Sequence, residues 1–255
     1  YVEYYHFVKE EDAEANYYQI GNSKWYYEGS FWDQMPDLDL YSEAVRGELE
    51  QAAKFWLDLG VDGFRLDGVK YFDASDERNI EILRWFNDYV KGIKKDAYIV
   101  SEVWTDYTLA AEYLKSGVNS TFDFTMGQAS GTIASSVFTS KKNAGKKLAE
   151  AIIGVQETTK KANPDSTVAE FLTNHDTGRC ANFLVTAEKI KMAYALEILM
   201  TGNVFVYYGE EIGLSGSGKD ENLRAPMYWS NTDSTGMTDG PADMEKEDYM
   251  FPSFA

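Results

Sequence analysis

Arg65 and Asp67 stand two residues apart in the segment 60–70, which the sequence predicts to be a short buried strand. Side chains two apart on a strand point to the same face, so the guanidinium is expected beside the carboxylate. A neighbouring cation favours the charged form of a carboxyl group. An ionised, oriented carboxylate is the nucleophile that glycosyl transfer requires, and a structural salt bridge at a strand end is the plainer alternative.

Two further apolar segments deliver polar side chains of the same kind. Glu102 lies near the end of one predicted strand, and His175 with Asp176 follows another. The carboxyl ends of the strands of a parallel barrel lie on one face, so Asp67, Glu102 and Asp176 are expected to meet there. Two carboxyl groups in different protonation states, one attacking and one donating a proton, are the machinery of glycoside hydrolysis.

The composition narrows the class of protein. The 255 residues, 44% of them hydrophobic, are compatible with one α/β barrel or two ordinary domains. A net charge of −18 argues against nucleic acid and anionic membrane surfaces as partners, and it is compatible with a neutral sugar. No apolar run approaches 18 residues, so no membrane span is expected. The single cysteine, Cys180, is interpreted as a space-filling residue.

Helical and strand patterns alternate along most of the chain. Residues 1–40 are aromatic and turn-rich, with short strands expected at 26–27 and 31–32, and residues 126–140 are expected to form a loop. Helices are predicted at 42–59, 77–95, 108–116, from the end of that loop to about 161, and at 186–200; strands are predicted at 60–70, 97–104, 120–125, 167–174 and 204–208. Five strands that each follow a helix predict an α/β fold with a parallel sheet.

Three segments in this order resemble signature segments of the α-amylase family, glycoside hydrolase family 13. They are GFRLD at 63–67, SEVW at 101–104 and FLTNHD at 171–176. MPDLDL at 35–40 and RAPMYW at 224–229 are similar to further family segments. The resemblance implies an incomplete (β/α)8 TIM barrel of about five β/α units, corresponding to barrel strands four to eight. Residues 1–40 would be part of the inserted domain B, and residues 41–255 a partial catalytic barrel.

The resemblance also assigns roles to individual residues. Asp67 would be the nucleophile and Glu102 the general acid and base. Asp176 would bind sugar hydroxyls and help to distort the ring, and His175 would bond hydroxyls of the same sugar. Arg65 would hold Asp67 ionised and oriented.

The resemblance also implies contacts to the sugars on the leaving-group side of the cleaved bond, and a metal site. Lys70 matches the family's Lys-His pair, which contacts the leaving-group sugars, but Tyr71 replaces the histidine. By the same resemblance, a small residue such as Gly68 directly after the nucleophile implies cleavage of α-1,4 bonds, because members that cleave α-1,6 bonds often carry Val there. A Ca²⁺ ion is implied between domain B and the barrel, with Asp37 and the backbone carbonyl of Tyr71 among its ligands and the site incomplete in this chain. A turn is the alternative for Asp37, because Pro-Asp is typical of turns.

The expected function is retaining hydrolysis of α-1,4-glucosidic bonds in starch or maltodextrins, so that the partner is an α-glucan or malto-oligosaccharide. Alternatives within the family are an α-glucosidase, an oligo-1,6-glucosidase or a transglycosylase. An alternative of another class is a non-catalytic carbohydrate-binding or accessory fragment. Starch is usually met outside the cell, so secretion is expected, with the cytoplasm as the alternative. The chain alone is expected to be weakly active or inactive, because its site lacks a wall.

Overall fold

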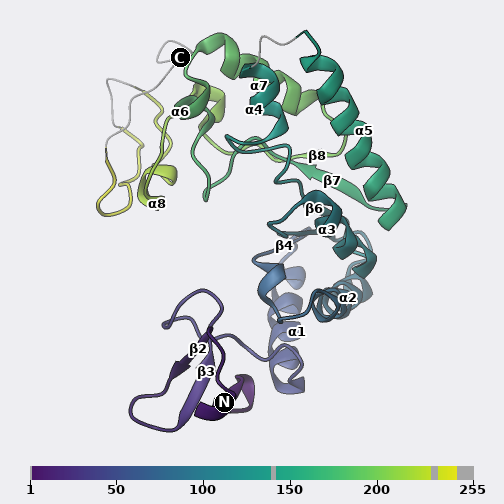
Figure 1. Cartoon of the computed structure of the whole chain (residues 1–255), viewed down its shortest axis with the longest axis vertical. Helices are drawn as coiled ribbons and strands as arrows, with labels where there is room; N and C mark the ends of the chain where they lie inside the picture. The colour runs from purple at the N-terminus through teal and green to yellow at the C-terminus, as the bar shows by residue number, and fades with distance from the viewer. Residues whose placement is uncertain (1, 139–141, 231–234, 246–255) are drawn as a thin grey trace. The chain divides into compact units, whose positions relative to one another are not determined.

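The computed structural model forms two compact units (Figure 1). The first contains the chain up to Val103 together with Glu112–Asn119, and the second contains Trp104–Ala111 and the chain from Ser120 onward. The structure describes residues 2–138, 142–230 and 235–245. Among the described helices, none is both long and apolar enough to cross a membrane.

The first unit begins with a small antiparallel sheet. Its strands are β1 (Phe7–Lys9), β2 (Tyr17–Gln19) and β3 (Trp25–Glu28), in the order β1-β3-β2, with the short 3-10 helices η1 (Val2–Tyr4) and η2 (Glu10–Asp12) beside them. The strand expected at 26–27 is therefore confirmed. The one expected at 31–32 is wrong, because the chain turns there: the Met35 N–H donates to the Trp32 carbonyl at 3.1 Å.

Helices and strands then alternate in the first unit. The elements are α1 (Glu43–Asp58), β4 (Gly63–Leu66), η3 (Val69–Tyr71), α2 (Asp76–Ile93), β5 (Tyr98–Ser101) and η4 (Tyr113–Ser116). The α2 helix begins at a serine cap, where Ser75 Oγ accepts from the Arg78 N–H, and it buries Ile82, Leu83 and Val90. Both predicted helices and both strands are confirmed, with shorter strands than expected.

Strand β4 is less buried than its sequence predicts. It pairs in parallel with β5, from Gly63 opposite Tyr98 to Leu66 opposite Ser101, and among the described residues it pairs with no other strand. Its side chains are half-buried or exposed. A strand at the edge of a sheet has one uncovered side, which explains why the expectation of a buried strand is wrong.

The second unit continues the alternation. Its elements are α3 (Tyr107–Glu112), β6 (Ser120–Phe122), α4 (Thr132–Phe138), α5 (Ala144–Ala162), β7 (Thr167–Glu170), α6 (Cys180–Leu184), α7 (Ala187–Leu199), β8 (Asn203–Val204), η5 (Glu210–Ile212) and α8 (Asp220–Leu223). Strands β6, β7 and β8 pair in parallel, in sequence order. The fold is thus α/β with five parallel strands, as predicted. Strand β8 ends at Val204, four residues before the predicted end.

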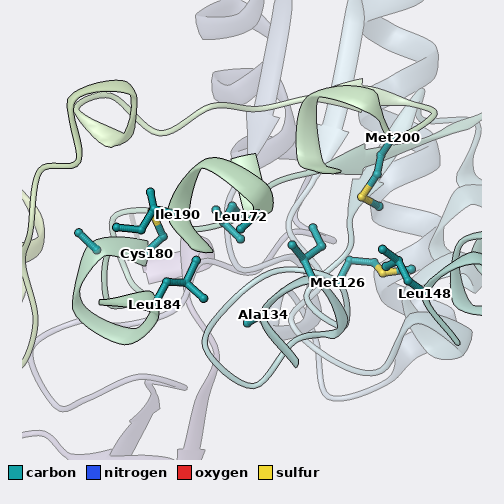
Figure 2. Close-up of a cluster of buried hydrophobic side chains, with 11 residues drawn as sticks. Met126, Ala134, Leu148, Leu172, Cys180, Leu184, Ile190 and Met200 are labelled. Carbon is teal, nitrogen blue, oxygen red and sulfur yellow. The ribbon is translucent and has the colours of Figure 1, made fainter. Parts of the chain in front are cut away.

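Helix α4 replaces residues 132–138 of the loop expected at 126–140, of which residues 139–140 lie outside the described residues. Two of its residues, Ile133 and Ala134, are fully buried and join a cluster formed with Met126, Leu172 and Leu184 (Figure 2). Helices this short are rarely stable alone, so packing rather than the Ser- and Thr-rich sequence accounts for it. Cys180 is buried in the same cluster, as expected of a space-filling residue.

Candidate active site

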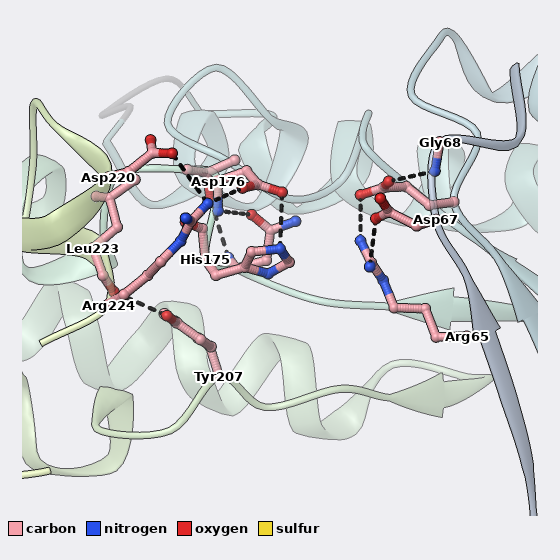
Figure 3. Close-up of polar contacts among 12 residues, drawn as sticks. Arg65, Asp67, Gly68, His175, Asp176, Tyr207, Asp220, Leu223 and Arg224 are labelled. Atoms are coloured by element: carbon pink, nitrogen blue, oxygen red, sulfur yellow. Dashed lines mark hydrogen bonds and ion pairs between the residues drawn. The ribbon is translucent and has the colours of Figure 1, made fainter. Parts of the chain in front are cut away.

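Arg65 bridges two carboxylates at the ends of β4 and β5 (Figure 3). Its Nη1 lies 2.6 Å from Asp67 Oδ1, and its Nη2 lies 2.7 Å from Glu102 Oε1. The parallel register places Leu66 opposite Ser101, so the two carboxylates follow the ends of neighbouring strands. The predicted contact between Arg65 and Asp67 is confirmed, and the second contact to Glu102 was not foreseen. The Asp67 side chain is 74% exposed, whereas Glu102 is buried.

A second donor fixes the other oxygen of Glu102. The Gly68 N–H donates to Glu102 Oε2 at 3.0 Å. Gly68 has a left-handed backbone, with φ of +53°, and a Cβ there would lie 3.3 Å from the Phe31 ring. Side chains with a Cβ rarely adopt this conformation. A glycine directly after the predicted nucleophile was the sequence signal for this tight turn.

Lys70 and Tyr71 follow in the one-turn helix η3. The Tyr71 ring is exposed and lies 5.0 Å from that of Phe31, at an angle of 59°. The Lys70 carbonyl accepts from Asn79 Nδ2 at 3.0 Å, which anchors the turn to α2. Both residues therefore lie close in the chain to the group of Arg65, and their predicted sugar contacts stay predictions.

The second unit holds the other predicted pair. His175 Nε2 lies 3.0 Å from Asp176 Oδ2, and the Asp176 N–H donates to Asn174 Oδ1 at 2.9 Å. Both side chains are partly exposed after β7. A third group, which sequence reasoning did not assign to the site, completes the cluster: Arg224 Nη2 lies 2.8 Å from Asp176 Oδ1 (Figure 3). The structure thus forms two groups, one per unit, and their meeting in one centre stays a prediction.

The comparisons with known proteins decide the family. The family model described as the alpha amylase catalytic domain matches residues 3–250. The chain belongs to the α-amylase family. Alpha-amylase 3 of Dictyoglomus thermophilum is 40% identical over 207 residues, which are 81% of this chain and 40% of that protein.

Solved structures agree with the assignment to the α-amylase family. Amy13B of Eubacterium rectale has 41% sequence identity and a TM-score of 0.93, over 99% of this chain and 50% of that one. The alpha-amylase from H. orenii has 31% identity and a TM-score of 0.76, over 94% of this chain and 49% of that one. The chain therefore spans about half the length of the relatives that it matches, and its fold corresponds to part of an α-amylase-family barrel.

The calcium site implied by the family resemblance would draw on Asp37 and on the backbone carbonyl of Tyr71. Asp37 Oδ2 accepts from the Ser30 N–H at 2.7 Å, and the Asp37 N–H donates to the Glu28 carbonyl. These contacts fit the turn that is the alternative role of Asp37. Within the described parts of the chain, no three His, Cys, Asp or Glu side chains are grouped to hold a metal ion. Calcium binding by Asp37 and Tyr71 stays a prediction, and no step below depends on it.

A separate group of carboxyls lies inside the second unit. Burial raises the pKa of Glu170 and of Glu210 to about 8 and that of Glu197 to about 7, and the neighbouring carboxylates add to the shift of the first two. All three are almost fully buried, and each has one oxygen without a hydrogen-bond partner. None of the three is among the predicted site residues, and their raised pKa values are expected to make the stability of the fold depend on pH.

Proposed function

We propose that this chain carries the catalytic carboxyls of a retaining glycoside hydrolase that cleaves α-1,4-glucosidic bonds in starch or maltodextrins. The observation that carries the proposal is the Arg65 bridge between Asp67 and Glu102, in a chain of the α-amylase family. Relatives named alpha-amylases at about 40% identity support the substrate class. Because starch is usually met outside the cell, we also propose that the protein is secreted.

In the first step Asp67 attacks the anomeric carbon. A bond forms between its carboxylate oxygen and that carbon while the glycosidic bond breaks, and Glu102 donates its proton to the leaving oxygen. The exposure of Asp67 leaves its carboxylate open to a substrate. Arg65 orients that carboxylate through its Nη1, which lies 2.6 Å from Asp67 Oδ1.

In the second step water replaces Asp67 at the anomeric carbon. Once Asp67 is esterified it carries no charge, and the Arg65 guanidinium is then left with the carboxylate of Glu102 as its partner. Arg65 Nη2 and the Gly68 N–H hold the two oxygens of Glu102 in place as this carboxylate takes a proton from the attacking water. One arginine thus supports the nucleophile before glycosylation and the base after it.

The other predicted residues would bind the sugar. Asp176 and His175 are proposed to hydrogen-bond hydroxyls of the sugar under attack, and Lys70 and Tyr71 are proposed to contact the sugar on the leaving side. Side-chain hydrogen bonds that strengthen as the ring distorts contribute several kcal/mol in such enzymes. A non-catalytic carbohydrate-binding protein has no need of two carboxyls joined by one arginine.

The test uses the natural protein that carries these residues, with Asp67→Asn beside Asp62→Asn as a matched control. Asp62 lies in the same segment, pairs with Lys94 and has no proposed role. We expect reducing ends from amylose, products released with the α configuration, a loss of at least about a thousandfold in Asp67→Asn and little change in the control. Full activity of Asp67→Asn would refute the nucleophile, and cleavage of isomaltose alone would refute the linkage.

A further inference from the structure

Arg224 makes more contacts than a surface ion pair requires. Besides the Asp176 carboxylate, its Nη2 lies 3.1 Å from Asp220 Oδ2, and its Nε donates to the His175 carbonyl at 3.3 Å. One guanidinium therefore holds both the side chain of Asp176 and the backbone of the preceding residue. Guanidinium groups suit this task, since their donors form a planar fork of fixed geometry.

The backbone on either side of Arg224 is clamped by two tyrosines. The Tyr207 hydroxyl donates to the Leu223 carbonyl at 2.9 Å, and the Tyr208 hydroxyl donates to the Ala225 carbonyl at 2.5 Å. Burial raises the pKa of Tyr207, which keeps its hydroxyl a donor. Figure 3 shows the Tyr207 contact beside the Arg224 ion pairs. The position of Arg224 is thus fixed at its backbone as well as at its guanidinium.

A buried arginine supports the two tyrosines in turn. Arg179 is 0% exposed, and its guanidinium carbon lies 4.3 Å from the ring centre of Tyr207 and 4.8 Å from that of Tyr208. Its Nη1 also donates to the Tyr208 carbonyl at 2.6 Å. Cation–π contacts strengthen as the groups are removed from water, and Arg179 is fully buried whereas Tyr208 is 39% exposed. The clamp therefore rests on the core of the second unit rather than on a loose loop.

We propose that Arg224 is a positioning residue, which sets the orientation of Asp176 for substrate through its ion pair and through the His175 carbonyl. The inference rests on the proposed function, in which Asp176 binds and helps to distort the sugar. With one oxygen held by Arg224 and the other near His175, the Asp176 carboxylate has a single orientation. An exposed pair alone contributes little, so the clamp and the shared contacts carry the proposal.

The kinetic test compares Arg224→Gln and Arg224→Lys in the natural protein. Asp176 acts on the distorted sugar, so a misplaced carboxylate lowers kcat more than it raises KM. We expect kcat to fall about 10- to 100-fold in Arg224→Gln with KM changed less than about threefold. Arg224→Lys keeps the charge without the planar fork of donors, so its kcat is expected to lie between that of Arg224→Gln and that of the unmodified protein. The control is Arg78→Gln, another partly exposed arginine in an ion pair, with Asp73.

Two further measurements test the positioning role of Arg224 without relying on the Arg224 kinetics alone. Asp220→Asn removes a solvent-exposed partner of Arg224 without disturbing the core, and it is expected to lower kcat about two- to fivefold. The imidazole NMR signal of His175 is expected to move in Arg224→Gln, while that of His6, which contacts Asp39, stays in place. Wild-type kcat in Arg224→Gln and Asp220→Asn together would overturn the inference.

Failure of the proposed function gives a different pattern. If the unmodified protein releases no reducing ends from any α-glucan, the proposed function fails, and the His175 signal alone then judges Arg224. A signal that moves supports the positioning role, and one that stays in place in Arg224→Gln rejects it. If the unmodified protein is active and the Arg224 variants have the same kcat as it does, the proposed function stands and the positioning role is rejected.

Discussion

At the scale of single residues, the central feature is one guanidinium shared by two carboxylates. Arg65 holds an exposed Asp67 with one nitrogen and a buried Glu102 with the other. The two carboxyls differ in their surroundings: Asp67 is exposed and open to the anomeric carbon, whereas Glu102 is buried and held at both oxygens by Arg65 and the Gly68 N–H. The assignment of the acid can therefore be tested apart from that of the nucleophile.

Glu102→Gln in the natural protein is expected to lower kcat on maltodextrin by about 100- to 10,000-fold, because the leaving oxygen loses its proton donor. The same variant should retain far more of its glycosylation rate on α-maltosyl fluoride, whose leaving group needs no proton. Stopped-flow release of fluoride measures that step. Asp67→Asn, measured beside it, should fail on both substrates. Equal losses for Glu102→Gln on the two substrates would contradict the acid assignment.

The sequence predicts contacts between residues that are close in the chain, but not those between residues that are far apart in it. The period of a strand places Arg65 and Asp67 on one face, and the structure confirms their contact. The bonds from Arg65 and Gly68 to Glu102 cross more than thirty residues, so no local pattern encodes them. Arg224 meets Asp176 across 48 residues, and only its place in a family-like segment pointed to it.

At the scale of elements, β4 is held against β5 by a glycine. A Cβ on Gly63 would lie 1.7 Å from the Tyr98 carbonyl oxygen, which no side chain can occupy. Gly63→Ala is expected to lower the free energy of unfolding by about 2 kcal/mol or more, because the backbone must move apart. Gly47 in α1 has open space around its Cβ position, so Gly47→Ala should raise stability by about 0.5 to 1 kcal/mol. Urea unfolding of both variants measures the contrast, and similar stabilities would contradict the packing.

The elements that the sequence missed share one physical cause. Helix α4 lies in a stretch rich in Gly, Ser and Thr, residues that favour loops, and it is stabilised by the burial of Ile133 and Ala134. Strand β8 stops at Val204 although apolar residues continue, because Tyr207 and Tyr208 direct their hydroxyls to the 223–225 segment instead. In both cases tertiary contacts override local preference. The long amphipathic helices α1, α2 and α5 were predictable because their apolar period is sustained.

At the scale of the whole molecule, the chain combines a family match across nearly its full length with coverage of about half of its relatives. The residue types of the predicted centre are all present, in two units that each arrange their own group. The net charge of −18 is carried mostly at the surface, which suits a neutral substrate. The buried carboxyls of the second unit are the exception, and they link folding to pH.

The stability of the fold is expected to fall as pH rises from about 5 to about 8. The pKa of Glu170 and Glu210 is about 8 in the folded chain, above the ordinary value of 4.5, so within this window the unfolded chain has lost protons that the folded chain retains. Stability then changes by about 1.4 kcal/mol per pH unit for each such proton, in favour of the unfolded chain as pH increases. The full contribution is present below the unfolded pKa and is lost as pH passes the folded pKa.

Glu170→Gln is expected to flatten this dependence, because the amide keeps the shape of the neutral carboxyl and does not ionise. Glu157→Gln, an exposed position on α5, should leave it unchanged. Urea unfolding at a series of pH values between 5 and 9 measures the slopes. The pKa values of Glu210 and Glu197 stay raised in this variant, so the slope should fall by about one proton's share and not vanish. An unchanged slope in Glu170→Gln would show that these carboxyls are already ionised in the folded chain.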